Sequence, residues 1–223
     1  MAAYCRFMPH DFILFDLDGT LSDPQLGIGR SINHALERHG FMPLAAGAVS
    51  RYIGPPLDES FRVITGRDDD ATIHALVATY RERYGDIGYA ENLLYAGIPE
   101  ALTTLADAGL PLGLCTSKRR DFACKILALF QLDHLFRFVD GGEIGVHKWQ
   151  QIAALRAAGQ VSEQSLMVGD RAVDMVAAHR NGLAAAGVLW GHGSRDELQA
   201  ESPRYLLEAP TEITRWCRPE VPA

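Results

Sequence analysis

The sequence predicts an α/β fold: a doubly wound, Rossmann-like parallel-sheet core with a small α-helical cap domain inserted into it. Short apolar runs alternate with segments of helical periodicity, which is the pattern of strand–helix–strand units in a parallel sheet. The long stretch between the first two apolar runs carries only helical patterns, which exceeds a simple crossover. With 48% hydrophobic and 22% charged residues among 223, the chain has the composition of a folded globular protein.

Four continuous apolar runs are expected to be buried parallel strands, because strands covered on both faces lack a polar alternation. They are Phe12–Phe15, Leu110–Cys115, Leu166–Val168 and Ala184–Leu189. Two weaker runs, Phe136–Val139 and Tyr205–Leu207, are expected to add further strands to the same sheet.

Helical segments separate these strands, with apolar residues at three- and four-residue spacing and turn residues at their ends. The expected helices of the core are Pro99–Ala108, Asp121–Phe130, Trp149–Ala158, Val173–Asn181 and Arg195–Ala200. The inserted segment contributes Ile28–His39, Leu57–Ile64 and Ala71–Tyr84.

Turn-type residues mark the two junctions between the core and the insertion, near Leu21–Pro24 and Asn92–Gly97. We therefore expect residues 1–22 and 92–223 to form an α/β catalytic core and residues 23–91 to form the helical cap. The acidic run Asp68–Asp70 at a helix start is expected to cap that helix rather than to bind a metal.

Charge and composition exclude several classes of function. The chain has 21 basic and 28 acidic residues, a net charge of −7, which disfavours nucleic-acid polymers and anionic membranes. No apolar run reaches the length of a signal peptide or a membrane span. The four cysteines lack metal-ligand spacing and are typical of free thiols in a reducing compartment. We expect a cytoplasmic monomer or homodimer with a small-molecule partner.

Polar residues stand after four of the expected strands, either at the carboxyl end of the strand or at the start of the next helix. They are the stretch Asp16-Leu17-Asp18-Gly19-Thr20, the stretch Thr116-Ser117-Lys118, Lys148, and Gly169-Asp170 with Asp174 one helical turn later. Each of these is common by itself at a turn or helix start. Because the carboxyl ends of parallel strands face one crevice, we interpret all four as one site.

In this order, the four motifs resemble those of the haloacid dehalogenase superfamily of phosphohydrolases, over nearly the whole chain. A helical cap after the first strand resembles the subgroup that includes phosphoglycolate phosphatases and β-phosphoglucomutases. The stretches Tyr52–Leu57 and Gly187–Gly191 are similar to phosphoglycolate-phosphatase-like enzymes described as 5′-nucleotidases.

The resemblance implies an aspartyl-phosphate mechanism with Mg²⁺ as cofactor. Asp16 would be the nucleophile, and Asp18 would be the general acid and then the general base. The carboxylates of Asp16 and Asp170 and the backbone carbonyl of Asp18 would bind the Mg²⁺. Asp174 would orient a metal-bound water or Lys148 from outside the ligand set, and Thr20 would fix the loop around Asp18.

Phosphate oxygens would be held by residues from three of the motifs: Asp18, Gly19, Thr116, Ser117 and Lys148. Thr116 would offer its hydroxyl, Ser117 its amide and Lys148 its charge.

Other residues near the motifs are given weaker or structural roles. In the cap, Gly54 and Pro55 would form a rigid loop over the site, and Arg51 would meet a second substrate anion or remain a surface arginine. Lys118 is expected to be a solvated lysine, and Arg171 is interpreted as an ordinary helix-start residue.

We therefore expect a phosphomonoester hydrolase for a small metabolite, with a nucleoside 5′-monophosphate as the first choice and 2-phosphoglycolate as the alternative. Asp18 together with Asp170 argues against carbon–halogen and carbon–phosphorus cleavage, because the relatives that perform those reactions carry other residues. A phosphosugar mutase uses the same aspartate pair and stays open. A non-enzymatic phospho-acceptor module is disfavoured, since it needs neither a cap nor Asp18.

Overall fold

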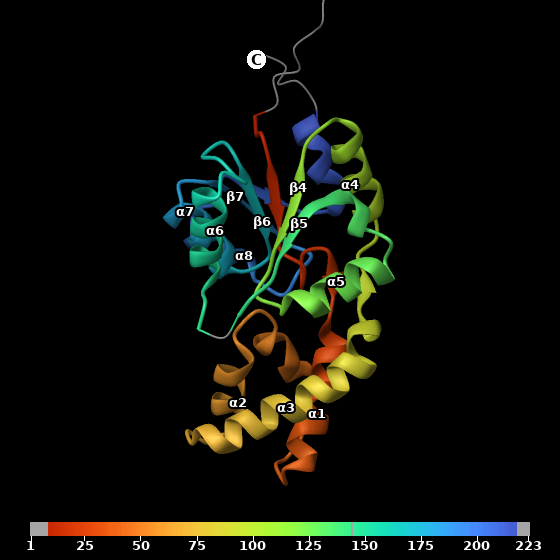
Figure 1. Ribbon diagram of the computed structural model, residues 1–223, viewed down its shortest axis with the longest axis vertical. Coiled ribbons are helices and arrows are strands. Elements are labelled where there is room, and N and C mark those ends of the chain that lie inside the picture. The colour runs from red at the N-terminus through yellow and green to blue at the C-terminus, as the bar shows by residue number, and fades with distance from the viewer. Residues whose placement is uncertain (1–8, 144, 218–223) are drawn as a thin grey trace, which may run out of the picture.

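The computed structural model describes residues 9–143 and 145–217, and its centre is the expected parallel sheet (Figure 1). The strands run in the order β5-β4-β1-β6-β7-β8, and every neighbouring pair is parallel. Their bounds are β1 Ile13–Phe15, β4 Leu112–Cys115, β5 Phe136–Asp140, β6 Leu166–Gly169, β7 Ala184–Val188 and β8 Tyr205–Leu207. This order places β1 between β4 and β6, so three strand ends with predicted site residues are neighbours.

Helices cover both faces of the sheet (Figure 1). One face packs on α4 (Ile98–Asp107), α5 (Arg120–Leu129) and the 3₁₀ helices η3 (Asp133–Leu135) and η4 (Pro210–Cys217); the other packs on α6 (Lys148–Ala157), α7 (Ala172–Arg180) and α8 (Arg195–Ala200). Side chains of β1 alternate between the two cores: Ile13 and Phe15 enter the first, Leu14 the second. No described helix has both the length and the apolar character that crossing a membrane requires.

The inserted segment has a hydrophobic core of its own, below the sheet in Figure 1. It is built from α1 (Gln25–Arg38), the 3₁₀ helix η1 (Ala46–Tyr52), α2 (Leu57–Thr65) and α3 (Asp70–Asp86), and the 3₁₀ helix η2 (Gly88–Glu91) follows. The expected capping role of the acidic run is confirmed at Asp69, whose side chain accepts from the Thr72 amide at 2.9 Å. Phe122 of α5 also packs into this core of the inserted segment.

The two junctions form a short antiparallel pair that the sequence did not predict. In β2 (Ser22–Asp23) and β3 (Leu93–Leu94), Ser22 pairs with Leu94 and Asp23 pairs with Leu93. The expected turn-like junctions therefore lie side by side, and the chain enters and leaves the inserted segment at one place.

The expected strands and helices are all present, and most of their ends differ by one or two residues from the prediction. The largest difference among the cap helices is α1, which begins at Gln25 rather than Ile28. Gly27 hides this start because glycine is a poor helix former. A Cβ at Gly27 would lie 2.1 Å from the carbonyl oxygen of Gly88, so the packing of α1 against η2 requires a glycine.

Candidate active site

The chain turns sharply after β1, and this turn carries two acids. Asp16 and Asp18 are both buried, and the Asp16 amide donates to the Val168 carbonyl of β6 at 2.9 Å. Gly19 has a φ of +84°, and a Cβ there would lie 2.1 Å from Oδ2 of Asp170. Only glycine therefore brings this turn against the end of β6.

The end of β4 supplies the predicted hydroxyl residues. Thr116 is buried, and its Oγ1 accepts from the backbone amide of Lys118 at 3.2 Å. Its own amide donates to the Asp140 carbonyl at 3.0 Å, which fixes the strand end, while Ser117 is exposed. The structure thus places both residues on the strand next to β1.

Lys148 joins the strand ends from the first residue of α6. Its Nζ lies 2.8 Å from Oδ1 of Asp16 and also donates to Oδ1 of Asp174 in the first turn of α7. Asp174 accepts in addition from the Arg171 amide at 3.1 Å. Burial alone would lower the pKa of Lys148, but the two carboxylates outweigh it and raise that pKa above its usual value.

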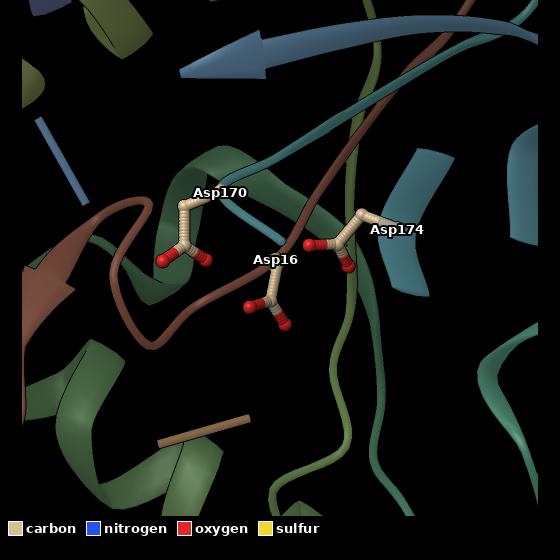
Figure 2. A group of neighbouring side chains, drawn as sticks. All are labelled: Asp16, Asp170 and Asp174. Atoms are coloured by element: carbon tan, nitrogen blue, oxygen red, sulfur yellow. The ribbon is translucent and has the colours of Figure 1, made fainter. Parts of the chain in front are cut away.

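Three buried carboxylates meet beside this lysine (Figure 2). Asp16, Asp170 and Asp174 each offer a carboxylate oxygen, and the three atoms lie within 4.8 Å of one another. Burial raises the pKa of Asp170 well above its usual value, and the charges of Asp174 and Asp16 add to this effect. Burial also raises the pKa of Asp174 to about 6, against the opposing influence of Lys148. When all three carboxyl groups are ionised, the cluster has more negative charge than one lysine neutralises.

These donors fit Mg²⁺. All are hard oxygen ligands, the kind that this cation prefers. Asp170 Oδ2 accepts from the His192 amide at 2.8 Å, whereas its Oδ1 is buried without a hydrogen-bond partner among the described residues. A buried, unpaired carboxylate oxygen facing two other acids is satisfied by a bound cation. The cluster contains Asp174, which was expected outside the ligand set, and does not include the Asp18 side chain.

The sequence that forms this site matches a known protein family. Residues 13–188 match the family described as haloacid dehalogenase-like hydrolase, a span that contains the acids, hydroxyl residues and lysine of the four motifs. The chain belongs to the haloacid dehalogenase-like hydrolase family.

Relatives of this haloacid dehalogenase-like hydrolase include enzymes with different names. It is 42% identical to a 5′-nucleotidase of Pseudomonas aeruginosa, over 86% of this chain and 89% of the relative. It is 34% identical to the tyrosine-protein kinase PtkA of Mycobacterium tuberculosis, over 89% and 69%. A phosphoglycolate phosphatase of Pseudomonas putida is 28% identical over 88% and 75%.

Solved structures of the haloacid dehalogenase-like type share the fold described here. A family hydrolase from Streptococcus pneumoniae superposes with a TM-score of 0.86 at 27% identity, covering 94% of this chain and 99% of that one. The protein is thus a hydrolase of the haloacid dehalogenase-like type, with phosphatases among its relatives.

The prediction that Lys118 is a solvated lysine is wrong for this haloacid dehalogenase-like chain. Its side chain is only 6% exposed, and Nζ lies 2.8 Å from Oδ2 of Asp18 and 2.7 Å from the Tyr84 hydroxyl. Burial alone would lower its pKa, but the Asp18 charge outweighs this and raises it. Tyr84 lies on a cap helix far away in the sequence, so no local pattern could reveal the contact.

Arg171 precedes the first residue of α7, as predicted for a helix-start residue, but its side chain also contacts the cap. Its guanidinium donates from Nη1 to the Ile53 carbonyl of the cap at 2.6 Å and from Nε to Glu197 at 2.9 Å. Gly54, the next residue after Ile53, has a φ of +101°. A Cβ at this position would lie 3.5 Å from the Arg171 side chain. The expected cap loop thus sits against the residue that follows Asp170. Arg51 and Pro55 are exposed.

The loop after β7 contributes two contacts near the acids that were not predicted from the sequence. The Trp190 indole donates to the Thr20 carbonyl at 3.0 Å, and the His192 amide holds Asp170. The Thr20 hydroxyl is buried and has no hydrogen-bond partner among the described residues, so it does not hydrogen-bond Asp18. In the sequence, the two glycines that flank His192 were the sign that the backbone comes close to Asp170 there, since a Cβ at either position would clash with that residue.

A cavity of about 640 Å³ lies elsewhere, on the cap. Its lining includes Asp23, Arg30, His34 and Arg83, but none of the three clustered acids. It is therefore separate from the space that these acids face.

Proposed function

We propose that this protein is a Mg²⁺-dependent phosphomonoester hydrolase that forms an acyl phosphate on Asp16, with a nucleoside 5′-monophosphate as substrate. The observation that carries the proposal is the cluster of Asp16, Asp170 and Asp174 beside buried Lys148. Buried acids that face one another across a lysine suit phosphoryl transfer, in which cations must offset the charge of an anionic substrate.

Asp16 is the proposed nucleophile. Its carboxylate oxygen forms a bond to phosphorus while the bond from phosphorus to the leaving oxygen breaks, which leaves an acyl phosphate. Lys148 holds Oδ1 of Asp16 and reduces the repulsion between carboxylate and phosphate. When bound by Asp16, Asp170 and the Asp18 carbonyl, Mg²⁺ would supply further positive charge to the phosphate oxygens.

Asp18 is the proposed proton donor and acceptor. Its burial raises the pKa of the carboxyl, which favours a bound proton before the reaction. The departing oxygen takes this proton, and the resulting carboxylate then removes a proton from water as the water oxygen attacks the acyl phosphate. Inorganic phosphate leaves and Asp16 is restored; such proton transfer contributes about 10²–10⁴-fold in rate.

The remaining phosphate oxygens are proposed to be bound by the Thr116 hydroxyl, the Ser117 amide and the turn at Gly19. Thr116 and Gly19 lie at the ends of adjacent strands, which supports a shared binding position. Asp174 is proposed to hold Lys148 in place, since it accepts a hydrogen bond from that ammonium group.

Residues 23–91 are proposed to act as the cap that encloses the leaving group. The contact between Arg171 and the Ile53 carbonyl supports this, because it draws the loop containing Gly54 and Pro55 toward the acids. Arg51 is proposed to meet a second anion of the substrate. The similarity to a 5′-nucleotidase supports a nucleoside 5′-monophosphate, and the phosphoglycolate phosphatase relative supports the alternative.

The test is phosphate release from nucleoside 5′-monophosphates, 2-phosphoglycolate and hexose phosphates, with Mg²⁺ or with EDTA. Wild type is expected to release phosphate only with Mg²⁺, fastest from a nucleoside 5′-monophosphate, and Asp16→Asn is expected to release none. Release that persists in Asp16→Asn would contradict the proposed nucleophile. Preference for 2-phosphoglycolate would replace the proposed substrate.

A further inference from the structure

A chain of buried polar contacts leads from Asp18 out of the core and into the cap. Asp18 Oδ2 lies 2.8 Å from Nζ of Lys118, which also donates to the Tyr84 hydroxyl at 2.7 Å. Asn92 Nδ2 donates to the same hydroxyl at 3.3 Å, and Ser22 Oγ donates to Asn92 Oδ1 at 3.3 Å. Tyr84, Asn92 and Ser22 are all at most 5% exposed.

The members of this chain belong to separate parts of the fold. Asp18 and Lys118 follow β1 and β4 of the core, whereas Tyr84 lies on α3 of the cap. Ser22 lies in β2 and Asn92 directly precedes β3, the two crossings between core and cap. The contacts therefore connect Asp18 with the cap and with both connecting segments.

Tyr84 is held firmly at the cap end of the chain. Its ring stacks on Tyr80 with centroids 5.4 Å apart and meets the edge of Phe122 at 5.1 Å. The ammonium group of Lys118 also lies 4.5 Å from the Tyr84 ring centroid. The position of the hydroxyl is therefore set by the packing of the cap against α5.

At the other end, Lys118 holds one of the two carboxylate oxygens of Asp18. Oδ2 is paired with Lys118, whereas Oδ1 is buried without a hydrogen-bond partner among the described residues. Oδ1 is thus the oxygen that is free to meet a leaving group, and the pairing of Oδ2 determines where Oδ1 points. A cap that rotates away would take the Tyr84 hydroxyl from Lys118 and loosen this pairing.

We propose that Lys118 and Tyr84 are positioning residues for Asp18, so that its carboxylate is correctly oriented only when the cap is closed. The proposal rests on the proposed function in one respect, the role of Asp18 in proton transfer to the leaving group. A buried ion pair is often no better for stability than apolar residues of the same size. A role in orienting Asp18 for catalysis would explain why the buried pair of Asp18 and Lys118 is present.

Leaving-group dependence is the first test, because a merely structural role would not change it. The comparison uses kcat/KM, which reports the steps through departure of the leaving group. The substrates are a nucleoside 5′-monophosphate, whose alkoxide needs a proton, and p-nitrophenyl phosphate, whose phenolate does not. We expect Tyr84→Phe to lower kcat/KM for the nucleotide about 10-fold and Lys118→Met about 100-fold, each with a smaller loss for p-nitrophenyl phosphate.

Tyr80→Phe is the matched control. It removes a hydroxyl from the ring stacked on Tyr84 and leaves the contacts from Asp18 to Ser22 intact. We expect wild-type kcat/KM for both substrates. Equal losses on both substrates in Tyr84→Phe, or no loss on either, would overturn the proposal.

Hydrogen exchange of the metal-free protein tests the link to the cap without any turnover. Tyr84→Phe is expected to speed exchange of the β2–β3 amides relative to Tyr80→Phe, because the closed arrangement loses the hydroxyl that accepts from both Lys118 and Asn92. Equal exchange in these two variants would contradict the coupling between Asp18 and cap closure. Absence of turnover in wild type would instead reject the proposed function, which keeps the two failures apart.

Discussion

The ammonium group of Lys148 lies 2.8 Å from Oδ1 of Asp16, and both side chains are more than nine-tenths buried. This pair puts a positive charge next to the proposed nucleophile before any cation binds. Because Asp174 contacts the same ammonium group, the lysine compensates one acid at the end of β1 and another in the first turn of α7.

Replacing this lysine should affect both stability and activity. Lys148→Met keeps the length of the side chain but leaves the buried carboxylates without their cation, which costs roughly 3–5 kcal/mol for a broken buried pair. We expect urea unfolding in EDTA to show that loss and phosphate release to fall below detection. Arg137→Met, at an exposed position on β5, serves as the control and should unfold like wild type. Wild-type stability in Lys148→Met would contradict the importance of the pair.

The raised pKa of Asp174 should make the metal-free protein less stable as the pH rises. The folded state holds its proton up to a pH of about 6, whereas the ordinary value is 3.8. This contribution is therefore complete below pH 4 and is lost between pH 4 and 6, by up to about 1.4 kcal/mol for each pH unit. The measurement is urea unfolding in EDTA across this range for wild type and for Asp174→Asn, which lacks this carboxyl. The free energy of unfolding of wild type, minus that of Asp174→Asn, is expected to fall as the pH rises from 4 to 6; a rise would contradict the raised pKa.

Mg²⁺ should bind through Asp170 and stabilise the fold. In wild type, we expect Mg²⁺ to raise the melting temperature, since a ligand at one hundred times its Kd adds about 2.7 kcal/mol. Asp170→Asn should lose most of this response and should be at least as stable as wild type in EDTA, because one repelling carboxylate is gone. Glu163→Gln, at an exposed position, should keep the wild-type response. A full Mg²⁺ response in Asp170→Asn would remove this residue from the proposed ligand set.

Arg171 should hold the cap loop against the core. Arg171→Met removes the hydrogen bond to the Ile53 carbonyl, so exchange of the amides at Ile53, Gly54 and Leu57 should become faster. Arg195→Met is the matched control, because that arginine pairs with Glu208 on the core surface and is half exposed. Mass spectrometry after timed deuterium labelling measures the exchange rates of these amides in both variants. Faster exchange throughout α7 would indicate general loosening of the core and would contradict a contact specific to the cap.

Most of the fold and most of the acid cluster could be predicted from local sequence patterns. Continuous apolar runs predicted β1, β4, β6 and β7, because a strand that is buried on both faces has apolar side chains at nearly every position. The convergence of Asp16, Lys148 and Asp170 was predicted from their positions at the ends of expected parallel strands or at the next helix start, since carboxyl ends of parallel strands share one edge.

Contacts between distant segments could not be predicted in the same way. Lys118 has the sequence context of a surface lysine, and its burial depends on Tyr84 in the cap. Arg171 likewise depends on a backbone carbonyl that no side-chain pattern identifies. The pairing of Ser22 with Leu94 is only two residues long, too short for a strand period to appear.

That short pairing has a consequence for how the chain tolerates different insertions. Residues 22–23 and 93–94 are held together as neighbouring strands, so the ends of whatever lies between them are already adjacent. A tight turn of a few residues is enough to join two strands of this kind. The entropy of closing a longer segment grows only with the logarithm of its length. Segments of very different size can therefore occupy this position while the six-stranded sheet keeps the same chain connectivity.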